Sequence, residues 1–223
     1  MLKVSSTIYS CADAPAAILP DGNVLVMASP GFGNTPSHFW ELADGGPAFG
    51  NLSTGNGLST LQVNDPSSAP YVSAYEGRML ELPTGQILWS NDGQSGHAQF
   101  ATYTPKGSAN SSWLPVVSSV SSTLTVGSSG NPISGTNFNG FSLGASYGDD
   151  AQMSTNWPIV AITNNSSGDV CYARSYGFST MGVWTTGTTN AEFDIPSGCE
   201  TGASTLTVVV NGIASAGVSV TLS

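Results

Sequence analysis

The chain has 223 residues, of which 8% are charged, and four Lys and Arg against 14 Asp and Glu give a formal net charge of −10. So few cations exclude nucleic acids and anionic membrane surfaces as partners, because both present negative phosphate groups. No apolar stretch is long enough to cross a bilayer, so we expect no membrane insertion. The 27 Gly and 13 Pro residues, without amphipathic helical runs, predict an all-β protein with many tight turns.

Residues 1–105 contain a repeated hairpin pattern. The segment LPDGNVL at 19–25 recurs as LPTGQIL at 82–88, and each copy places a Pro-x-Gly turn between two apolar runs. A hairpin repeated in this way is typical of the blades of a β-propeller, here two kelch-type blades. The expected strands are 16–19, 24–28, 38–42 and 60–63 in the first blade, and 75–82, 86–89 and 97–103 in the second.

The pattern changes after residue 105. Residues 106–114 lack periodicity and are predicted to be a linker, and residues 115–223 lose the hairpin signature and alternate as short strands. Six or seven such strands in one domain favour an immunoglobulin-like β-sandwich. Its predicted core comprises Leu124, Val126, Ile162, Val170, Phe193, Leu206, Val208 and Val220.

The three cysteines have no metal-binding spacing. Two interpretations stay open: three buried thiols, or a Cys171–Cys199 disulfide with Cys11 unpaired. Export would favour the disulfide. The N-terminal residues do not form a signal peptide, yet the Ser, Thr, Gly and Asn content is typical of exported bacterial proteins. We therefore expect a secreted or cell-surface protein whose signal is not in this chain.

Four stretches, 77–88, 146–153, 179–183 and 200–206, resemble the C-terminal part of galactose-oxidase-like, kelch-type proteins of bacteria and fungi. The resemblance implies two propeller blades followed by an immunoglobulin-like domain, with the earlier blades missing. Members of the family usually carry an aromatic residue where Cys171 stands and an aliphatic one where Cys199 stands. The resemblance therefore implies that replacement of both by cysteine suits a disulfide.

The family binds copper through two tyrosines and two histidines, and one tyrosine is cross-linked to a cysteine. By resemblance Tyr75 occupies a tyrosine position, Glu76 replaces one histidine, and Gln152, which follows Tyr147-Gly148, replaces the other. Carboxylate and amide groups are poorer copper ligands than imidazole. The cross-linked pair would lie in blades that this chain does not contain, so we expect no metal, no cofactor and no radical alcohol oxidation.

Carboxylates offer a second chemistry. By resemblance, Glu76, Asp149 and Asp150 fall at the opening of the family's active site. Two carboxyl groups can together hydrolyse a glycosidic bond. Adjacent residues on a strand face opposite ways, so Glu76 would act with Asp149 or Asp150 but not with both. In the alternative interpretation, the Gly-Asp-Asp run is a loop whose carboxylates accept backbone hydrogen bonds.

Aromatic residues suggest sugar binding, while Trp40 and Trp89 are expected in the blade cores. Trp157 and Trp184 are the better exposed candidates, with Tyr147 and Gln152 beside them. Our first hypothesis is an exported carbohydrate-facing or adhesion-type module that binds a glycan or small carbohydrate. The alternatives are a glycoside hydrolase that uses Glu76, and a structural fragment that forms homo-oligomers through open blade edges.

Overall fold

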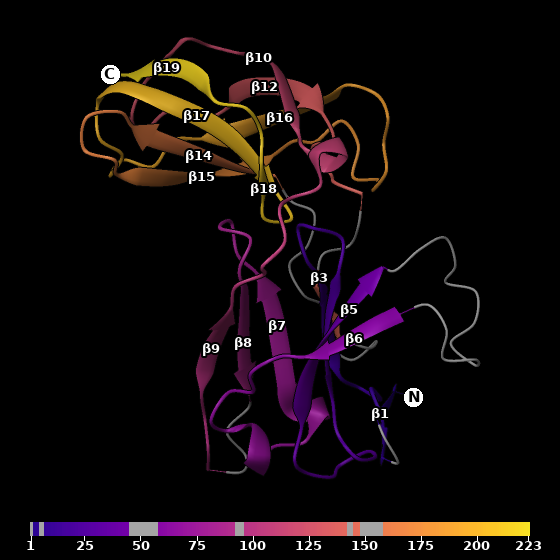
Figure 1. Cartoon of the computed structure of the whole chain (residues 1–223). Helices are drawn as coiled ribbons and strands as arrows, with labels where there is room; N and C mark the ends of the chain where they lie inside the picture. The colour runs from indigo at the N-terminus through magenta and orange to yellow at the C-terminus, as the bar shows by residue number, and fades with distance from the viewer. Residues whose placement is uncertain (1, 5–6, 45–57, 92–95, 142–144, 148–157) are drawn as a thin grey trace. The chain divides into compact units, whose positions relative to one another are not determined.

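The computed structural model describes residues 2–4, 7–44, 58–91, 96–141, 145–147 and 158–223 (Figure 1). The protein is all-β, as expected, and the helical turns of the described part are three short 3-10 helices. The chain divides into two compact units. Unit 1 comprises Met1–Ser108 and Gly144–Thr155, and unit 2 comprises Ala109–Leu143 and Asn156–Ser223. The sequence had placed 144–155 in the C-terminal domain, but this segment returns to unit 1.

Unit 1 contains a five-stranded antiparallel sheet in the order β13-β3-β4-β5-β6. The first predicted hairpin is present, because β3 pairs with β4 across a turn in which the Leu19 N–H donates to the Asn23 carbonyl at 2.7 Å. The unexpected member is β13, whose Tyr147 lies opposite Pro15 of β3. A separate hairpin pairs β1 with β2. The strands are β1 (Leu2–Val4), β2 (Thr7–Tyr9), β3 (Pro15–Ile18), β4 (Val24–Ala28), β5 (His38–Asp44), β6 (Leu58–Gln62) and β13 (Ala145–Tyr147).

The second repeat forms a three-stranded antiparallel sheet of β7 (Gly77–Glu81), β8 (Ile87–Asn91) and β9 (Phe100–Tyr103), which lie side by side in Figure 1. Its turn repeats the first one, with the Leu82 N–H donating to the Gln86 carbonyl at 2.8 Å. Two predicted strand starts are wrong. Two 3-10 helices, η1 (Ala69–Tyr71) and η2 (Ala74–Glu76), precede β7, which therefore begins after Glu76. Strand β9 begins three residues later than the predicted 97.

The core of unit 1 follows the alternation of its strands. One face of the five-stranded sheet packs against the inner residues of the β7–β9 sheet, and Trp89 is buried there as predicted. The opposite face buries Trp40 with Val26 and Ala28. Gly77 lets the backbone of β7 pack closely against Met27 and Trp89. A Cβ at this position would lie 2.6 Å from Met27 Sδ and 2.8 Å from Trp89 Nε1.

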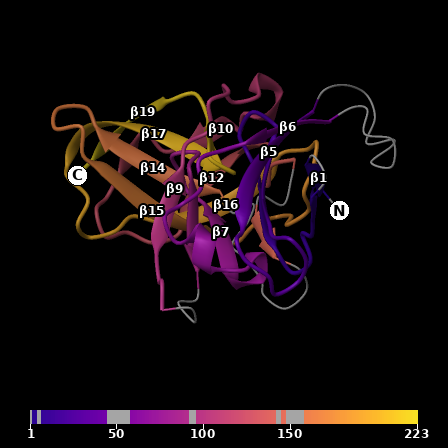
Figure 2. The same cartoon turned by 60° about the horizontal axis from the view of Figure 1, so that its bottom comes forward.

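Unit 2 is a single curled sheet in the order β10-β12-β16-β15-β14-β17-β19-β11, with β18 paired to β17. Its strands β14, β15 and β17 lie side by side in Figures 1 and 2. The hydrogen bonds do not separate two sheets, because β15 pairs with β14 through residues 170–173 and with β16 through residues 174–176. The strands are β10 (Val116–Val120), β11 (Thr123–Leu124), β12 (Asn131–Thr136), β14 (Ile159–Asn164), β15 (Val170–Tyr176), β16 (Thr189–Asp194), β17 (Gly202–Val210), β18 (Ile213–Ala214) and β19 (Val218–Leu222). The short helix η3 (Ser111–Trp113) precedes them in the predicted linker.

The predicted core of unit 2 is largely present. Leu124, Ile162, Phe193, Leu206, Val208 and Val220 are buried together, and Val126 packs against them. Val170 is the exception at 48% exposure, because Cys171 and Ala173 take the inward positions of β15 and Val170 points outward. No helix in the described part of the chain has the length and apolar character needed to span a membrane.

Candidate functional site

The predicted binding residue Trp184 stands on the surface of unit 2, in the connection between β15 and β16. It is 65% exposed and adopts a left-handed backbone conformation with φ of 60°. Its backbone N–H donates to the Gly140 carbonyl at 2.9 Å. Its indole packs edge-on against the Phe141 ring, with 4.8 Å between the ring centroids. We call residues 179–185 the Trp184 loop.

Backbone and side-chain hydrogen bonds hold the Trp184 loop in place. The buried Asn139 amide donates to the Thr180 carbonyl at 2.7 Å, and the Ser179 N–H donates to the Asn190 carbonyl at 2.9 Å. Met181 and Val183 are also exposed, at 55% and 38%. The loop thus presents three apolar side chains to solvent from a fixed backbone.

Unit 1 presents two stacked ring pairs on its connecting segments. Phe32, in the β4–β5 connection, stacks on Tyr75 of η2 with 5.3 Å between ring centroids. Tyr71 of η1 stacks on His97, in the β8–β9 connection, with 4.0 Å between centroids. The sequence singled out Tyr75 for a different role and gave no signal for the Tyr71–His97 pair, because its members come from distant segments.

The predicted catalytic carboxylate Glu76 has a structural role. Its Oε2 accepts a hydrogen bond from the Ser73 N–H at 3.1 Å, at the start of η2. The strand of Tyr147, β13, contacts β7, which begins directly after Glu76, so these two predicted segments do come together in unit 1. The predicted residues Asp149, Asp150, Gln152 and Trp157 lie outside the described residues, and only the backbone of Tyr147 is described.

A polar network that the sequence did not indicate joins the two sheets of unit 1. The nearly buried Glu41 of β5 accepts hydrogen bonds from the Tyr103 hydroxyl of β9 and from Asn23 Nδ2, and the same Asn23 amide donates to Asp21 at 3.2 Å. Burial, then the hydrogen bond to Glu41 and the charges of Glu41 and Asp21, raise the pKa of Tyr103 above its usual range. Each of the four side chains in this network has a hydrogen-bond partner, which fits a structural role.

A His–Asp pair lies on the other face of the same sheet. His38 Nδ1 is 2.7 Å from Asp65 Oδ2, while Asp65 Oδ1 accepts the Phe39 N–H at 2.9 Å. The rings of Tyr9 and Trp40 flank His38 at 5.7 and 5.6 Å between centroids. Asp65 thereby ties the segment after β6 to β5. Among the described residues no three His, Cys, Asp or Glu side chains are arranged to hold a metal ion.

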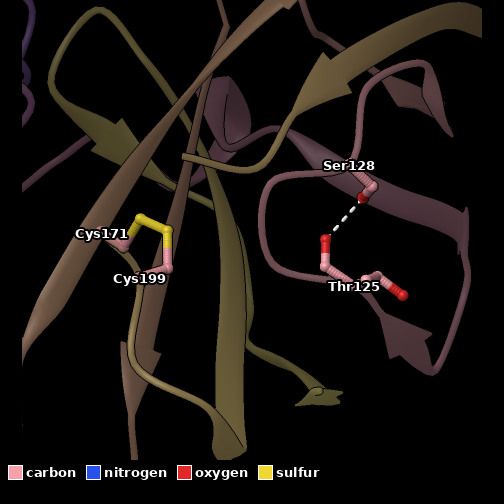
Figure 3. The surroundings of a disulfide bond; sticks show 4 residues. All are labelled: Thr125, Ser128, Cys171 and Cys199. Atoms are coloured by element: carbon pink, nitrogen blue, oxygen red, sulfur yellow. Dashed lines mark hydrogen bonds between the residues drawn. A yellow bond between two sulfur atoms is a disulfide. The ribbon is translucent and has the colours of Figure 1, made fainter. Parts of the chain in front are cut away.

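Cys171 and Cys199 form a disulfide with their Cα atoms 5.5 Å apart (Figure 3). Cys11 is an exposed free thiol. Of the two interpretations of the cysteines, the Cys171–Cys199 disulfide with Cys11 unpaired is therefore the one that the structure has. The bond connects β15 with the loop after β16, beyond Arg174 and Asp194, where the pairing of these two strands ends. A hollow of about 180 Å³ lies beside it, with Asp169 and Glu200 on its wall.

Glu81 of unit 1 is an ionisable group without a hydrogen-bond partner among the described residues. It ends β7 opposite Ile87, and both of its carboxylate oxygens are buried without a hydrogen-bond partner. Burial raises the pKa of Glu81 to about 8. The sequence gave no sign of this, because a glutamate at the end of a strand is normally solvated.

Comparison with known proteins gave no relative: no family model, no curated protein and no solved structure matches this chain.

Proposed function

We propose that the chain is an exported carbohydrate-binding module and that the Trp184 loop contacts the sugar. The observation that carries the proposal is the 65% exposure of Trp184 on a backbone held in the left-handed region. A non-glycine residue in that region carries strain, and residues held in such conformations cluster at functional sites. An exposed tryptophan face, edged by polar backbone groups, suits the apolar face of a sugar ring.

The composition supports a neutral ligand. The chain has four cations in 223 residues, and the segment 175–191, which includes the Trp184 loop, contains no charged residue. An anionic glycan would find no charge partner along this segment, whereas a neutral sugar needs only ring faces and hydrogen bonds. The engagement of Glu76 by the Ser73 N–H argues against the hydrolase alternative.

For the architecture, we propose two kelch-type propeller blades followed by an immunoglobulin-like domain, as in galactose-oxidase-like proteins without their copper site. The two hairpins with matching turns at Leu19–Asn23 and Leu82–Gln86 support the blade assignment. The curled sheet of unit 2 and its buried core support the second part.

A glycan array followed by calorimetric titration of the best neutral ligand tests this proposal. We expect Trp184→Ala to weaken binding about tenfold or more, as loss of a stacking contact does. Tyr172→Ala, a 46%-exposed aromatic residue of the same unit, is the matched control and should bind as the unaltered chain does. Equal affinity of Trp184→Ala and the unaltered chain would contradict the proposal, as would the absence of binding to any neutral glycan.

A further inference from the structure

We infer that unit 1 carries a second, separate carbohydrate-binding surface, formed by Tyr71, His97 and Gln99, that takes a neutral sugar. The Tyr71 and His97 rings are nearly parallel, with 12° between their planes. Tyr71 is nevertheless 54% exposed. A flat aromatic face is therefore open to solvent and backed by a second ring.

The backbone beneath this surface is fixed. Ala69, the first residue of η1, and Val72, which follows its last residue, are fully buried, and the buried Ser37 donates hydrogen bonds to both of their carbonyls. The Ser37 hydroxyl lies 2.7 Å from the Val72 carbonyl, and the Ser37 N–H lies 3.0 Å from that of Ala69. A tyrosine on such a segment offers contact area at a small entropic cost on binding.

A side-chain network also positions the His97 side of the surface. Asn91 Nδ2 donates to the His97 carbonyl at 2.8 Å and to Ser68 Oγ at 3.2 Å. Asn91 Oδ1 accepts the Gln99 N–H at 3.1 Å. Asn91, at the end of β8, thus holds the backbone of both His97 and Gln99.

Gln99 supplies a hydrogen-bond donor beside the rings. Its Oε1 accepts the Ser68 N–H at 2.9 Å and the Ser67 hydroxyl at 3.2 Å, which fixes the orientation of the amide. Its Nε2 donates to none of the described residues. Ser68 directly precedes η1 and Tyr71 ends it, about 6 Å further along the 3-10 helix, so the Gln99 amide is held at the start of the helix that carries Tyr71.

The groups at this surface indicate the chemistry of its ligand. An open ring face, an amide donor and the exposed Ser67 hydroxyl can stack on and hydrogen-bond a polyhydroxylated ring. Among the described residues, Tyr71, His97 and Gln99 make no hydrogen bond or ring contact with a Lys or Arg side chain, so these contacts supply no cation for a phosphate or carboxylate. The surface therefore fits a neutral sugar.

The test uses the full chain carrying Trp184→Ala, so that the Trp184 loop does not contribute. Cellohexaose and β-1,4-linked galactohexaose are titrated by calorimetry, and saturation-transfer NMR detects the bound sugar. We expect Tyr71→Ala to weaken association about tenfold, Tyr71→Phe to change it little because the ring remains, and Gln99→Ala to weaken it by a smaller factor. Phe100→Ala removes a 77%-exposed ring from β9 in the same unit and should have no effect.

The outcomes separate the two proposals. Loss of binding with Tyr71→Ala and not with Phe100→Ala supports the unit 1 surface, whatever Trp184 contributes in the unaltered chain. If neither hexasaccharide binds in the Trp184→Ala background, or if Tyr71→Ala binds as tightly as its parent, the unit 1 surface is overturned. Circular dichroism and thermal melting of each variant verify that the fold is intact.

Discussion

Ionisation of Glu81 couples the stability of unit 1 to pH. The carboxyl group has a pKa of about 8 in the folded chain against a reference value of 4.5, because its oxygens are removed from water without a hydrogen-bond partner. Between these two values the folded chain binds more protons at this site than the unfolded chain does. The contribution of Glu81 to the free energy of unfolding therefore falls as pH rises through this window.

We expect Glu81→Gln to remove this contribution. The unaltered chain should lose stability between pH 4.5 and 8, by at most about 1.4 kcal/mol per pH unit at this site, and the variant should lose less over the same range. Urea unfolding at pH 4.5, 6 and 8 measures the difference. Glu192→Gln, at an exposed position, serves as control and should keep the slope of the unaltered chain. Identical slopes for Glu81→Gln and the unaltered chain would refute the assignment.

At the scale of elements, the two hairpin turns of unit 1 use the same device. Gly22 and Gly85 both have positive φ, 93° and 79°. The N–H of each donates at 2.9 Å to the carbonyl of the leucine that begins its turn, Leu19 or Leu82. Such a backbone is strained for any residue with a Cβ. The repeated sequence therefore reproduces a backbone conformation as well as a hydrophobic pattern.

Gly22→Ala and Gly85→Ala should each destabilise the chain by about 1 kcal/mol or more, and by similar amounts, because alanine is disfavoured at positive φ. Gly198→Ala is the matched control: nothing lies within 4 Å of its added Cβ, and we expect a change below about 0.5 kcal/mol. Chemical denaturation compares the three. A neutral effect at either turn would show that the backbone there tolerates a side chain.

The sequence predicted those elements whose signals are local. Both hairpins were found because Pro-x-Gly turns fix their own geometry, and the exposure of Trp184 was expected from its loop. The start of β7 was missed, since 3-10 turns resemble strand in a short apolar run. The pairing of β13 with β3 is between distant segments, and no local pattern encodes it. Tyr71, His97 and Gln99 come from two connections, so their assembly follows from the fold alone.

At the scale of the whole molecule, the two units share one polypeptide in an interleaved order. Residues 109–143 belong to unit 2, residues 144–155 to unit 1, and residues 156–223 to unit 2 again. The edge strand β13 of unit 1 is therefore supplied from between two segments of unit 2. Unit 1 is incomplete in any chain that stops before residue 147.

A chain ending at Ser108 should consequently have a less protected β3. Residues 15–17 of β3 lie beside β13 in the full chain, and Ala16 and Ala17, which have backbone N–H groups, oppose Ser146 and Ala145. We expect faster hydrogen exchange at 16–17, by at least about tenfold, while β8, which pairs on both sides within the fragment, keeps its protection. Equal exchange at β3 in the fragment and the full chain would show that β13 adds nothing to unit 1.

The interleaving also sets the order in which the units are finished during synthesis. Once residue 108 has been synthesised, nine of the ten described strands of unit 1 are present, yet the tenth, β13, follows only after η3, β10, β11 and β12. Strands β10, β11 and β12 belong to the sheet of unit 2, which also needs β14 to β19, and these are synthesised later still. During synthesis both units are therefore incomplete at the same time, and the sheet of unit 2 can be completed only after β19 has been synthesised.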